Sequence, residues 1–590
     1  MCLVSSPAAP SSTELPDGAY FSVIGNVRVE AGGQTRLALL RHRLFTLHAG
    51  VSLPILTYNP VPSYEPIRAE LRAQGQLLDV SELRNLHEEL REWTGLGEGT
   101  GDLPDPGTSA HDIDDGYPWR RRHGAGTPDE VWDYLRRDGT RYLRTPPTDV
   151  EGEVFLCGAD GRPVRSWPAL GGLWRWWTRQ VMPTTGKVFL ISDSRFIAEE
   201  LGRLRDPRVH LLHQMHNPHL TGERRWWSPV SDSYRTSMER LGDLDALLSL
   251  TDRQRTDIAR RYGSSTQLFV VPNPVESPPM PAEPPARDRA SIVMIARLDA
   301  QKRLDRAVEA LALVRRQIPD ATLDIYGDGP LRAQLEQQIA AAGLDDAVTL
   351  HGHDPRAREA LWRCGLFWLT SAFEGYPLST LEAMSHACPV VSMDMPYGPR
   401  EQITDGADGF LVGPGDVAAL ADRTVALLRR PELLAPMRRA ARATAEAHGH
   451  ERFLADWASV LHEVVALKEQ RRSVTDQSWS IERRFPRGRA CAWTGRLDLA
   501  TPDRDHLDDL ELVAEAWSPE TDQIVELPQR VSHTGTGVRF EGLITRAELR
   551  SRLPGAATAH LRAGYRWANL AAFEPITLSA LPLTTWRRWH

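Results

Sequence analysis

The chain has 590 residues, enough for three or four domains that each bury a core of their own. Its formal net charge of −8 at pH 7 argues against a general nucleic-acid-binding protein, because such proteins carry an excess of cations. Five scattered cysteines suit neither a disulfide framework nor a zinc site. We find no signal peptide and no apolar run of about twenty residues. We therefore expect a cytoplasmic protein with at most peripheral contact to the inner face of the membrane.

The N-terminal part predicts a first Rossmann-like domain over residues 19–272, after a Pro- and Ser-rich stretch, 1–18, that we expect to be disordered. Tyr20 to Val29 is typical of a buried strand, and Gly32 and Gly33 follow before an Arg-rich helix. Two glycines between a strand and a helix let the backbone approach a diphosphate closely. A tight strand-to-helix turn explains the same pair equally well.

From about residue 103 to 170 the alternation of helices and strands stops. Gly, Pro and Asp become frequent there, and short alternating segments such as Val154 to Leu156 predict a β-rich insertion in the first domain. Tryptophans gather after it in GLWRWW, and Trp226 and Trp227 form a second group. Each group either packs in a core or lines an exposed surface for an oligomer, an acceptor or a membrane.

A histidine cluster occurs in VHLLHQMHNPHL, at positions 210, 213, 216 and 219. A spacing of three invites a metal site, but Asn217-Pro218 breaks any helix, and no Cys or carboxylate completes a ligand set. We therefore expect no metal here. Asp193 is interpreted as a turn or cap residue without chemistry.

A Pro-rich linker precedes a second Rossmann-like domain, expected over residues 286–450. In this domain Lys302 is one of only three lysines among 70 Lys and Arg residues, and it stands between an apolar strand and a helix. Arg297 precedes it by five residues. An ammonium suits a point contact to one phosphate, and a planar guanidinium suits a bidentate contact to another. The pair would neutralise a pyrophosphate leaving group.

Two weaker signals follow at strand ends. Gly327 opens a Gly-Asp-Gly-Pro turn after the strand from Ala321 to Tyr326, and His353 follows the strand from Val348 to Leu350. Taken by themselves, both are ordinary turn or loop residues.

Residues 365–413 are the most informative part of the chain. They predict strand, loop, helix and strand, with the loop at the carboxyl edge of a parallel sheet, where such folds bind ligands. Glu374 lies in the loop, and Glu382 follows eight residues later in the helix. Two carboxylates beside a helix N-terminus suit a ligand with many hydroxyls. With Ser379, however, Glu382 also fits a capping box, which would make it a helix-start residue only.

The loop between the two glutamates offers backbone groups as well. Its residues are Gly375, Tyr376, the turn residue Pro377 and Leu378. The free N–H groups of Gly375, Tyr376 and Leu378 suit phosphate oxygens.

The Glu-x(seven)-Glu pair resembles the signature of retaining GT-B glycosyltransferases. The segment YGPREQI, residues 397–403, narrows the resemblance to enzymes that glycosylate poly(glycerol phosphate) or poly(ribitol phosphate) teichoic acids, and to relatives that glycosylate Ser-rich adhesins. The Gly-Gly turn and the Arg-x(four)-Lys pair match the same family. The resemblance covers residues 19–472.

The resemblance implies an α/β GT-B fold, in which two Rossmann-like domains face a cleft and a helix over residues 451–472 crosses back to the first domain. It also implies roles for the site residues. Arg297 and Lys302 would stabilise the departing diphosphate, Glu382 would hold the ribose diol, and Glu374 would position the sugar. The remaining expected contacts are His216 and His219 near the sugar or acceptor, Gly32 and Gly33 at the diphosphate, Gly327 and His353 at the base, and the 375–378 loop.

The implied reaction is a retaining transfer of glucose or N-acetylglucosamine from a UDP-sugar to a hydroxyl acceptor, without a metal cofactor. The expected acceptor is a polyol-phosphate (teichoic acid) polymer or a related cell-surface glycan. Alternatives are O-glycosylation of Ser or Thr in a protein, transfer to a small molecule, a phosphorylase or epimerase on the same fold, and a non-catalytic carbohydrate-binding scaffold.

The tail, residues 478–590, lies outside the resemblance. Alternating segments separated by Pro, Asp and Gly predict a small β-sandwich, which would bind acceptor, mediate assembly or only stabilise the chain. The β-rich insertion and this tail are the two places where we expect a homo-oligomer to form.

Overall fold

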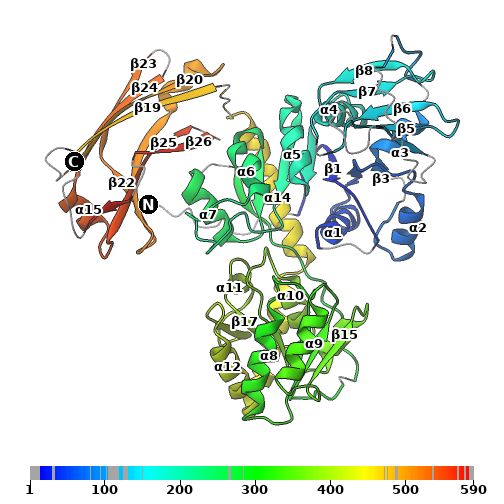
Figure 1. Cartoon of the computed structure of the whole chain (residues 1–590), viewed down its shortest axis with the longest axis vertical. Helices are drawn as coiled ribbons and strands as arrows, with labels where there is room; N and C mark the ends of the chain where they lie inside the picture. Colours follow the sequence, from blue (N-terminus) through cyan, green and yellow to red (C-terminus); the bar gives the residue numbers. More distant parts are fainter. Residues whose placement is uncertain are drawn as a thin grey trace. The chain divides into compact units, whose positions relative to one another are not determined.

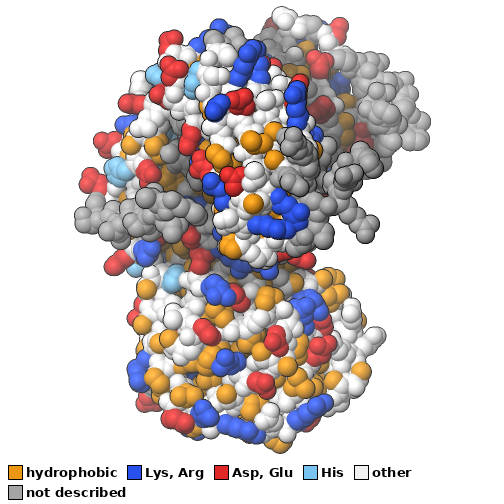
Figure 2. All heavy atoms as spheres, turned by 90° about the vertical axis from the view of Figure 1, so that its left-hand side faces the viewer, with side chains coloured by type: hydrophobic (Ala, Val, Ile, Leu, Met, Phe, Trp, Pro, Cys, Tyr) orange, Lys and Arg blue, Asp and Glu red, His pale blue; other side chains and the backbone are white. Residues whose placement is uncertain are grey.

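The structure is a computed structural model (Figure 1). It describes residues 13–29, 33–79, 82–93, 95–100, 102–103, 119–123, 130–148, 150–263, 267–283, 285–470, 472, 474, 476–485, 490–534, 537–567, 570–576 and 580–583. Gly32, most of the expected disordered N-terminus and part of the expected insertion lie outside the described residues. Among the described helices, none combines the length and the apolar character that a membrane span requires. On the face drawn in Figure 2, basic and acidic side chains are interspersed.

A seven-stranded sheet forms the first Rossmann-like domain, with the order β12-β11-β10-β9-β1-β2-β3. Every residue of β9 and β10 is buried, as is typical of parallel strands that are covered on both faces. The strands are β1 (Ala19–Ile24), β2 (Ile55–Thr57), β3 (Leu83–Asn85), β9 (Val188–Ser192), β10 (Val209–Gln214), β11 (Ala246–Ser249) and β12 (Leu268–Val270). The helices are α1 (Gly33–His48), α2 (Glu65–Ala73), α3 (Leu86–Glu92), α4 (Leu170–Val181), α5 (Arg195–Leu201), α6 (Asp232–Glu239) and α7 (Asp252–Tyr262).

The expected β-rich insertion is a five-stranded antiparallel sheet between α3 and α4, with the order β4-β5-β6-β7-β8. Each strand pairs with its neighbour in sequence, so the sheet is a simple meander. Its strands are β4 (Arg120–His123), β5 (Val131–Leu135), β6 (Arg141–Thr145), β7 (Val154–Cys157) and β8 (Pro163–Trp167).

The second Rossmann-like domain contains a six-stranded parallel sheet with the order β15-β14-β13-β16-β17-β18. The strand order reverses between β13 and β16, which creates the switch point where open α/β sheets bind ligands. The strands are β13 (Ser291–Ile295), β14 (Thr322–Tyr326), β15 (Val348–Gly352), β16 (Leu366–Leu369), β17 (Val390–Met393) and β18 (Gly409–Val412). The helices are α8 (Leu304–Arg315), α9 (Arg332–Ala341), α10 (Leu378–Ser385), α11 (Pro399–Gln402), α12 (Val417–Arg429) and α13 (Pro431–Ala447).

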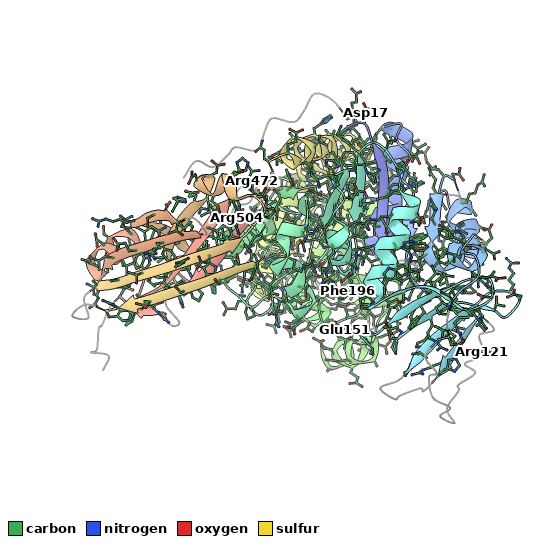
Figure 3. All side chains as sticks on the ribbon, turned by 90° about the horizontal axis from the view of Figure 1, so that it is seen from above. Asp17, Arg121, Glu151, Phe196, Arg472 and Arg504 are labelled. Atoms are coloured by element: carbon green, nitrogen blue, oxygen red, sulfur yellow. The ribbon has the colours of Figure 1, made fainter. Side chains whose placement is uncertain are left out.

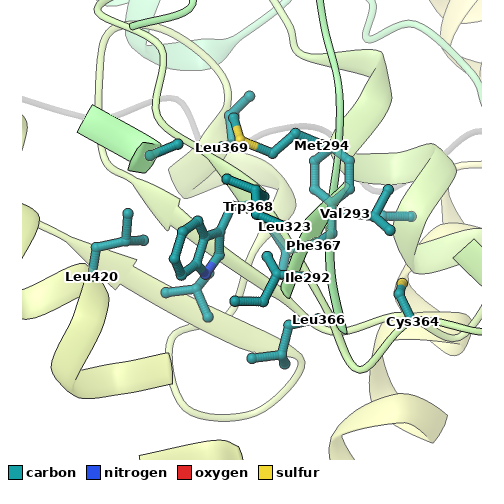
Figure 4. Close-up of a cluster of buried hydrophobic side chains, with 14 of the residues drawn as sticks. Ile292, Val293, Met294, Leu323, Cys364, Leu366, Phe367, Trp368, Leu369 and Leu420 are labelled. Atoms are coloured by element: carbon teal, nitrogen blue, oxygen red, sulfur yellow. The ribbon is translucent and has the colours of Figure 1, made fainter. Parts of the chain in front are cut away.

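The core of this domain lies between the sheet and its helices. Trp368 of β16 is fully buried, and its indole N–H donates to Thr424 Oγ1 at 2.9 Å. Figure 4 shows its ring near Leu420, with Ile292 of the neighbouring strand β13 and Leu323 of β14, the next strand along, in the same cluster. A buried aromatic whose polar atom is satisfied helps to fix the position of β16, and therefore of the loop that follows it.

After α14 (His450–Lys468) the chain forms a C-terminal β domain of two antiparallel sheets, β19-β20-β24-β23 and β22-β21-β25-β26. Both sheets contribute to one apolar core that includes Trp493, Phe540 and Trp567, so the domain is a sandwich. Its elements are β19 (Asp476–Arg484), β20 (Ala490–Ala500), β21 (Glu511–Ser518), β22 (Gln523–Leu527), β23 (Gln529–Thr534), β24 (Gly537–Thr545), α15 (Arg546–Arg552), β25 (Thr558–Trp567), β26 (Leu570–Pro575) and β27 (Leu581–Pro582).

These elements confirm the fold class that the sequence predicts: two Rossmann-like domains, a β-rich insertion in the first, and an added C-terminal β domain. The chain divides into two compact units. One holds residues 1–216, 243–247 and 450–462, and the other holds residues 217–242, 248–449 and 463–590. The second unit therefore contains α7, the second Rossmann-like domain and most of the C-terminal part.

Candidate active site

The candidate site lies at the carboxyl ends of β13 and β16, the adjacent strands of the switch point. The β13 loop carries Arg297 and Lys302, and the β16 loop carries Glu374. Gly327 makes room for the first loop, because a Cβ at this position would lie 2.0 Å from Ala296 O and its φ is +137°. The backbone at Gly327 therefore packs against the loop that holds Arg297.

Lys302 and Glu374 form an ion pair at this edge of the sheet. Lys302 Nζ lies 2.7 Å from Glu374 Oε1, and the two side chains are 17% and 9% exposed. Ser371 Oγ donates to the same oxygen at 2.6 Å, and Gln301 Nε2 donates to Glu374 Oε2 at 3.2 Å. Three donors thus fix the carboxylate of Glu374 before any ligand arrives. Ser371 and Gln301 were not singled out from the sequence.

Arg297 differs from Lys302 in its exposure. Its side chain is 73% exposed, and its guanidinium pairs with Asp299 Oδ2 at 3.0 Å within the same loop. A surface pair of this kind contributes little stability, so the guanidinium can turn to an anionic ligand at small cost. Lys302 also stands just before α8, whose N-terminus favours a bound anion.

Glu382 lies on α10 and binds a partner that the sequence did not reveal. Arg358 Nη2 donates to Glu382 Oε1 at 2.7 Å, and the glutamate side chain is 12% exposed. The capping-box interpretation of Glu382 is wrong, because α10 begins at Leu378 with Pro377 at the N-cap position and no side-chain cap. Ser379 therefore lies inside the helix. A helix-start role does not explain this carboxylate.

The loop from Gly375 to Leu378 is held by the YGPREQI segment. The N–H of Glu374 donates to Pro396 O at 3.1 Å, and the N–H of Tyr397 donates to Glu374 O at 2.6 Å. Gly398 permits this close approach, since a Cβ there would lie 2.5 Å from Pro377 Cδ and its φ is +109°. Tyr376 is buried in this contact region. The segment that narrowed the family resemblance thus supports the backbone of the glutamate loop.

His216 sits in a buried charge network of the first domain. Its Nε2 lies 2.9 Å from Asp193 Oδ1, and the guanidinium of Arg41 pairs with both oxygens of that carboxylate. Arg41 also donates to Gln214 Oε1 at 2.9 Å. Burial alone would raise the pKa of Asp193, but the charge of Arg41 and the hydrogen bond from His216 outweigh it and lower that pKa. The turn-or-cap interpretation of Asp193 is therefore wrong: this carboxylate orients His216.

His219 has different surroundings from His216. Its ring is fully buried, and it stacks on Tyr397 with a centroid distance of 6.4 Å and an interplanar angle of 6°. Burial lowers the pKa of His219 to about 3, so the ring is neutral at pH 7. Of the two expected histidines, only His216 has a side chain in part exposed, at 10%.

The remaining expected site residues make fewer contacts. Gly33 is the first residue of α1, and no atom would lie within 4 Å of a Cβ added there. His353 is exposed after β15. The neighbouring His351 makes the contacts instead: its Nε2 lies 2.7 Å from Asp324 Oδ1, and its ring stacks on Tyr326 at 4.3 Å.

A cavity of about 510 Å³ lies between the insertion and the first Rossmann-like domain. Arg120 stacks over Trp132 at 4.7 Å, and Arg122 is bound by Glu130 through two contacts of 2.7 Å. Arg121, labelled in Figure 3, extends from the same strand. The aromatic side chains that line the cavity are Tyr58, His87, Trp132, Tyr134 and Trp174. Aromatic faces beside planar charged groups suit a sugar or polyol ligand.

The described residues contain no group of three or more His, Cys, Asp or Glu that could hold a metal ion. His213 contacts Ser192 O, and His216 contacts the carboxylate of Asp193. Both contacts are made by β10 and the loop after it, so packing explains the spacing of these two histidines.

Comparisons with known proteins agree with this architecture. Residues 279–444 match the family described as glycosyl transferases group 1. The poly(glycerol-phosphate) alpha-glucosyltransferase of Bacillus subtilis (strain 168) is 28% identical over 288 residues, which are 48% of this chain and 42% of that protein. The chain thus spans less than half the length of this curated relative.

Two solved structures share the fold. A mutant of S. aureus TarM, in complex with Fondaparinux, alpha-GlcNAc-glycerol and UDP, has a TM-score of 0.59 and 19% identity, and the match covers 75% of this chain and 99% of that one. The pneumococcal O-GlcNAc transferase GtfA, in complex with UDP and GlcNAc, has a TM-score of 0.55 and 19% identity over 76% and 99% of the two chains. These matches confirm the resemblance predicted from the sequence: the chain has the GT-B fold, and its residues 279–444 match the model of the glycosyl transferases group 1 family.

Proposed function

We propose that the chain is a retaining glycosyltransferase that transfers glucose or N-acetylglucosamine from a UDP-sugar to a hydroxyl acceptor. The observation that carries the proposal is the Lys302–Glu374 ion pair at the switch point, with the exposed guanidinium of Arg297 in the same loop. A cation beside a fixed carboxylate at this edge suits a ligand that is anionic at one end and rich in hydroxyls at the other.

In the proposed reaction, the bond between the sugar C1 and the β-phosphate oxygen breaks, and a bond from C1 to the acceptor oxygen forms on the same face. The leaving phosphate oxygen takes the proton of the acceptor hydroxyl. Lys302 and Arg297 stabilise the negative charge that develops on the diphosphate. Glu374 positions the sugar hydroxyls, and Glu382, fixed by Arg358, accepts from the ribose diol. His216, oriented by Asp193, contacts the sugar or the acceptor.

For the acceptor we propose a polyol-phosphate polymer or a related cell-surface glycan. Two observations support this choice: the Bacillus relative is named for poly(glycerol phosphate), and the TarM complex contains alpha-GlcNAc-glycerol and UDP. The aromatic and arginine-lined cavity is the place we propose for a segment of that polymer. The alternative acceptor is a protein hydroxyl, which the O-GlcNAc transferase GtfA supports as a second candidate.

Three further proposals concern the setting of the reaction. We propose that no metal cofactor takes part, because the cations of the site are side chains. We propose that the chain works in the cytoplasm, at the inner face of the membrane when its acceptor is there. A homo-oligomer would form through the β-rich insertion or the C-terminal β domain.

The proposal is tested with the purified chain, a panel of UDP-, GDP- and ADP-sugars, and purified poly(glycerol phosphate). We expect UDP release only when the polymer is present, and an α-linked product by NMR from an α-linked donor. Lys302→Ala should slow the reaction by at least roughly ten- to a hundredfold, since a single charge-assisted hydrogen bond contributes about 1.5–3 kcal/mol. Lys187→Ala, at an exposed lysine outside the site, is the matched control. Equal rates for the two variants would refute the assignment of Lys302.

A further inference from the structure

Helix α7 (Asp252–Tyr262) is held at both ends by charged side chains from other domains. At its N-terminus, the carboxylate of Glu401 accepts from the N–H groups of Asp252 at 2.8 Å and Arg253 at 3.0 Å. Glu401 belongs to α11, which is part of the second Rossmann-like domain. A carboxylate suits this end, because the first N–H groups of a helix have no partner inside it and carry the positive end of its dipole.

At the other end of α7 the contact comes from the C-terminal β domain. Arg562 of β25 donates to Arg261 O at 3.0 Å and also to Arg260 O, the carbonyl before it. The Arg562 side chain is 11% exposed and is paired with Glu515. Guanidinium donors suit this end, since the last carbonyls of a helix carry its negative end. The negative charge of Glu401 at the N-terminus and the positive charge of Arg562 at the C-terminus are therefore both favourable with respect to the dipole of α7.

A built interface surrounds the Arg562 contact. Asp522 accepts from Arg260 Nη1 at 2.9 Å and from the indole N–H of Trp226 at 2.9 Å. Trp517 packs against Trp226 at 4.6 Å and against Trp227 at 5.8 Å. Trp226 is only 3% exposed, so the packing alternative is correct for this tryptophan. The C-terminal domain is thus attached to α7 and its surroundings through buried aromatic and charged contacts.

The middle of α7 is linked to the candidate active site. Tyr397 is wholly buried, and its hydroxyl donates to Asp257 Oδ2 at 2.8 Å. The backbone N–H of the same tyrosine donates to Glu374 O. A continuous series of contacts therefore runs from Arg562 through α7 and Tyr397 to the glutamate loop.

We propose that the C-terminal β domain is a positioning element of the donor site. It fixes α7 through Arg562 and Asp522, and α7 holds residues 396–403 against the backbone of the loop from Glu374 to Leu378. This inference rests on the proposed function, because it assigns the loop to the donor. Arg562 and Asp522 touch no substrate and act through the helix, so they are positioning residues.

The test compares Arg562→Met, Arg562→Lys and Asp522→Asn in the full chain. Asparagine suits position 522, where φ is +55°. Arg530→Met is the matched control, because Arg530 lies in the same domain and is 89% exposed. We expect Arg562→Met and Asp522→Asn to raise the donor KM three- to tenfold, with Arg562→Lys partly restoring it and the control unchanged. A domain that only stabilises the chain would lower the active fraction, and so the apparent kcat, without moving KM.

Hydrogen exchange gives a readout that does not depend on catalysis. In Arg562→Met we expect the amides of residues 374–378 and 396–403 to exchange about tenfold faster, while those of β13 stay as in the unchanged chain. Faster exchange in the C-terminal domain alone, with an unchanged donor KM, would overturn the inference. If no UDP-sugar reacts at all, the proposed function fails, and the exchange rates still decide whether α7 transmits the contact.

A double-mutant cycle with Glu401→Gln makes the test sharper. Glu401 and Arg562 bind opposite ends of an 11-residue helix and so lie roughly 15 Å apart along it. If both act through α7, the double variant should change the donor KM by clearly less than the product of the two single effects. Effects that multiply would show that the two contacts act independently, and would contradict the proposal.

Discussion

The Lys302–Glu374 pair should behave as a single unit in catalysis. In the structure Glu374 accepts from Lys302 at 2.7 Å, from Ser371 at 2.6 Å and from Gln301 at 3.2 Å. Both charged side chains are largely buried, at 17% and 9% exposed. Glu374→Gln keeps the shape of the side chain but removes its charge, and Lys302→Met removes the matching cation. Either change leaves one charge without its partner.

The magnitude follows from that geometry. Removing one partner of a buried pair costs about 3–5 kcal/mol, and the partial exposure of Lys302 reduces this to about 2–4 kcal/mol. If the loss falls on the transition state, kcat/KM decreases by roughly 30- to 1,000-fold for each single variant. The double variant should lose about as much as the worse single variant, because the pair is removed as a unit.

The assay is the initial rate of acceptor-dependent UDP release for the four proteins of the cycle. Circular dichroism and thermal unfolding confirm that each variant is folded. Losses that simply multiply in the double variant would refute the reasoning, since they would mean that Lys302 and Glu374 act separately.

Three further predictions concern other parts of the chain. Asp193→Asn should reduce kcat more than tenfold and destabilise the fold at pH 7. Because folding lowers the pKa of Asp193, this group contributes its full stabilisation above about pH 4 and loses it as the pH falls further. The thermal unfolding temperatures of the variant and the unchanged chain should therefore converge in acid. The pKa of His219 is about 3 in the folded chain and about 6.5 in the unfolded chain, so this histidine takes up a proton on unfolding between those two pH values. Its contribution to the free energy of unfolding should therefore decrease by about 1.4 kcal/mol for each pH unit of acidification below about pH 6.5. His219→Gln should remove this contribution to the pH dependence of unfolding. Trp132→Ala should weaken binding of poly(glycerol phosphate) about tenfold in calorimetry and leave UDP binding unchanged; equal affinity for the polymer would exclude the cavity as its site.

The placement of Lys302 and Glu374 in one site could be predicted from the sequence. Each of the two residues follows an apolar segment that is typical of a parallel strand, and the carboxyl ends of neighbouring parallel strands meet at the same edge of the sheet. The partners of these residues could not be predicted in the same way. Arg358 reaches Glu382 from a separate 3-10 helix (Ala357–Trp362), and such a contact depends on tertiary packing that no local pattern records.

Two interpretations failed for the same reason. Asp193 looked like a turn residue, but Arg41, 152 residues away in the sequence, folds against it and makes it a buried anion. Glu382 fitted a capping box with Ser379 as the N-cap residue, but Pro377 occupies the N-cap position and the helix begins at Leu378. Ser379 already lies inside the helix and cannot cap it. The role of Trp226 was equally hidden, because its partner Trp517 belongs to the C-terminal β domain.

The central claim is that the cations of the β13 loop bind the diphosphate of a nucleotide sugar. The most direct measurement is calorimetric titration of UDP into the unchanged chain, Lys302→Met, Arg297→Met and the control Lys187→Met. The account predicts that UDP binds the unchanged chain and the control equally, and that each site variant weakens binding by roughly tenfold or more. Equal UDP affinity in all four proteins would contradict it.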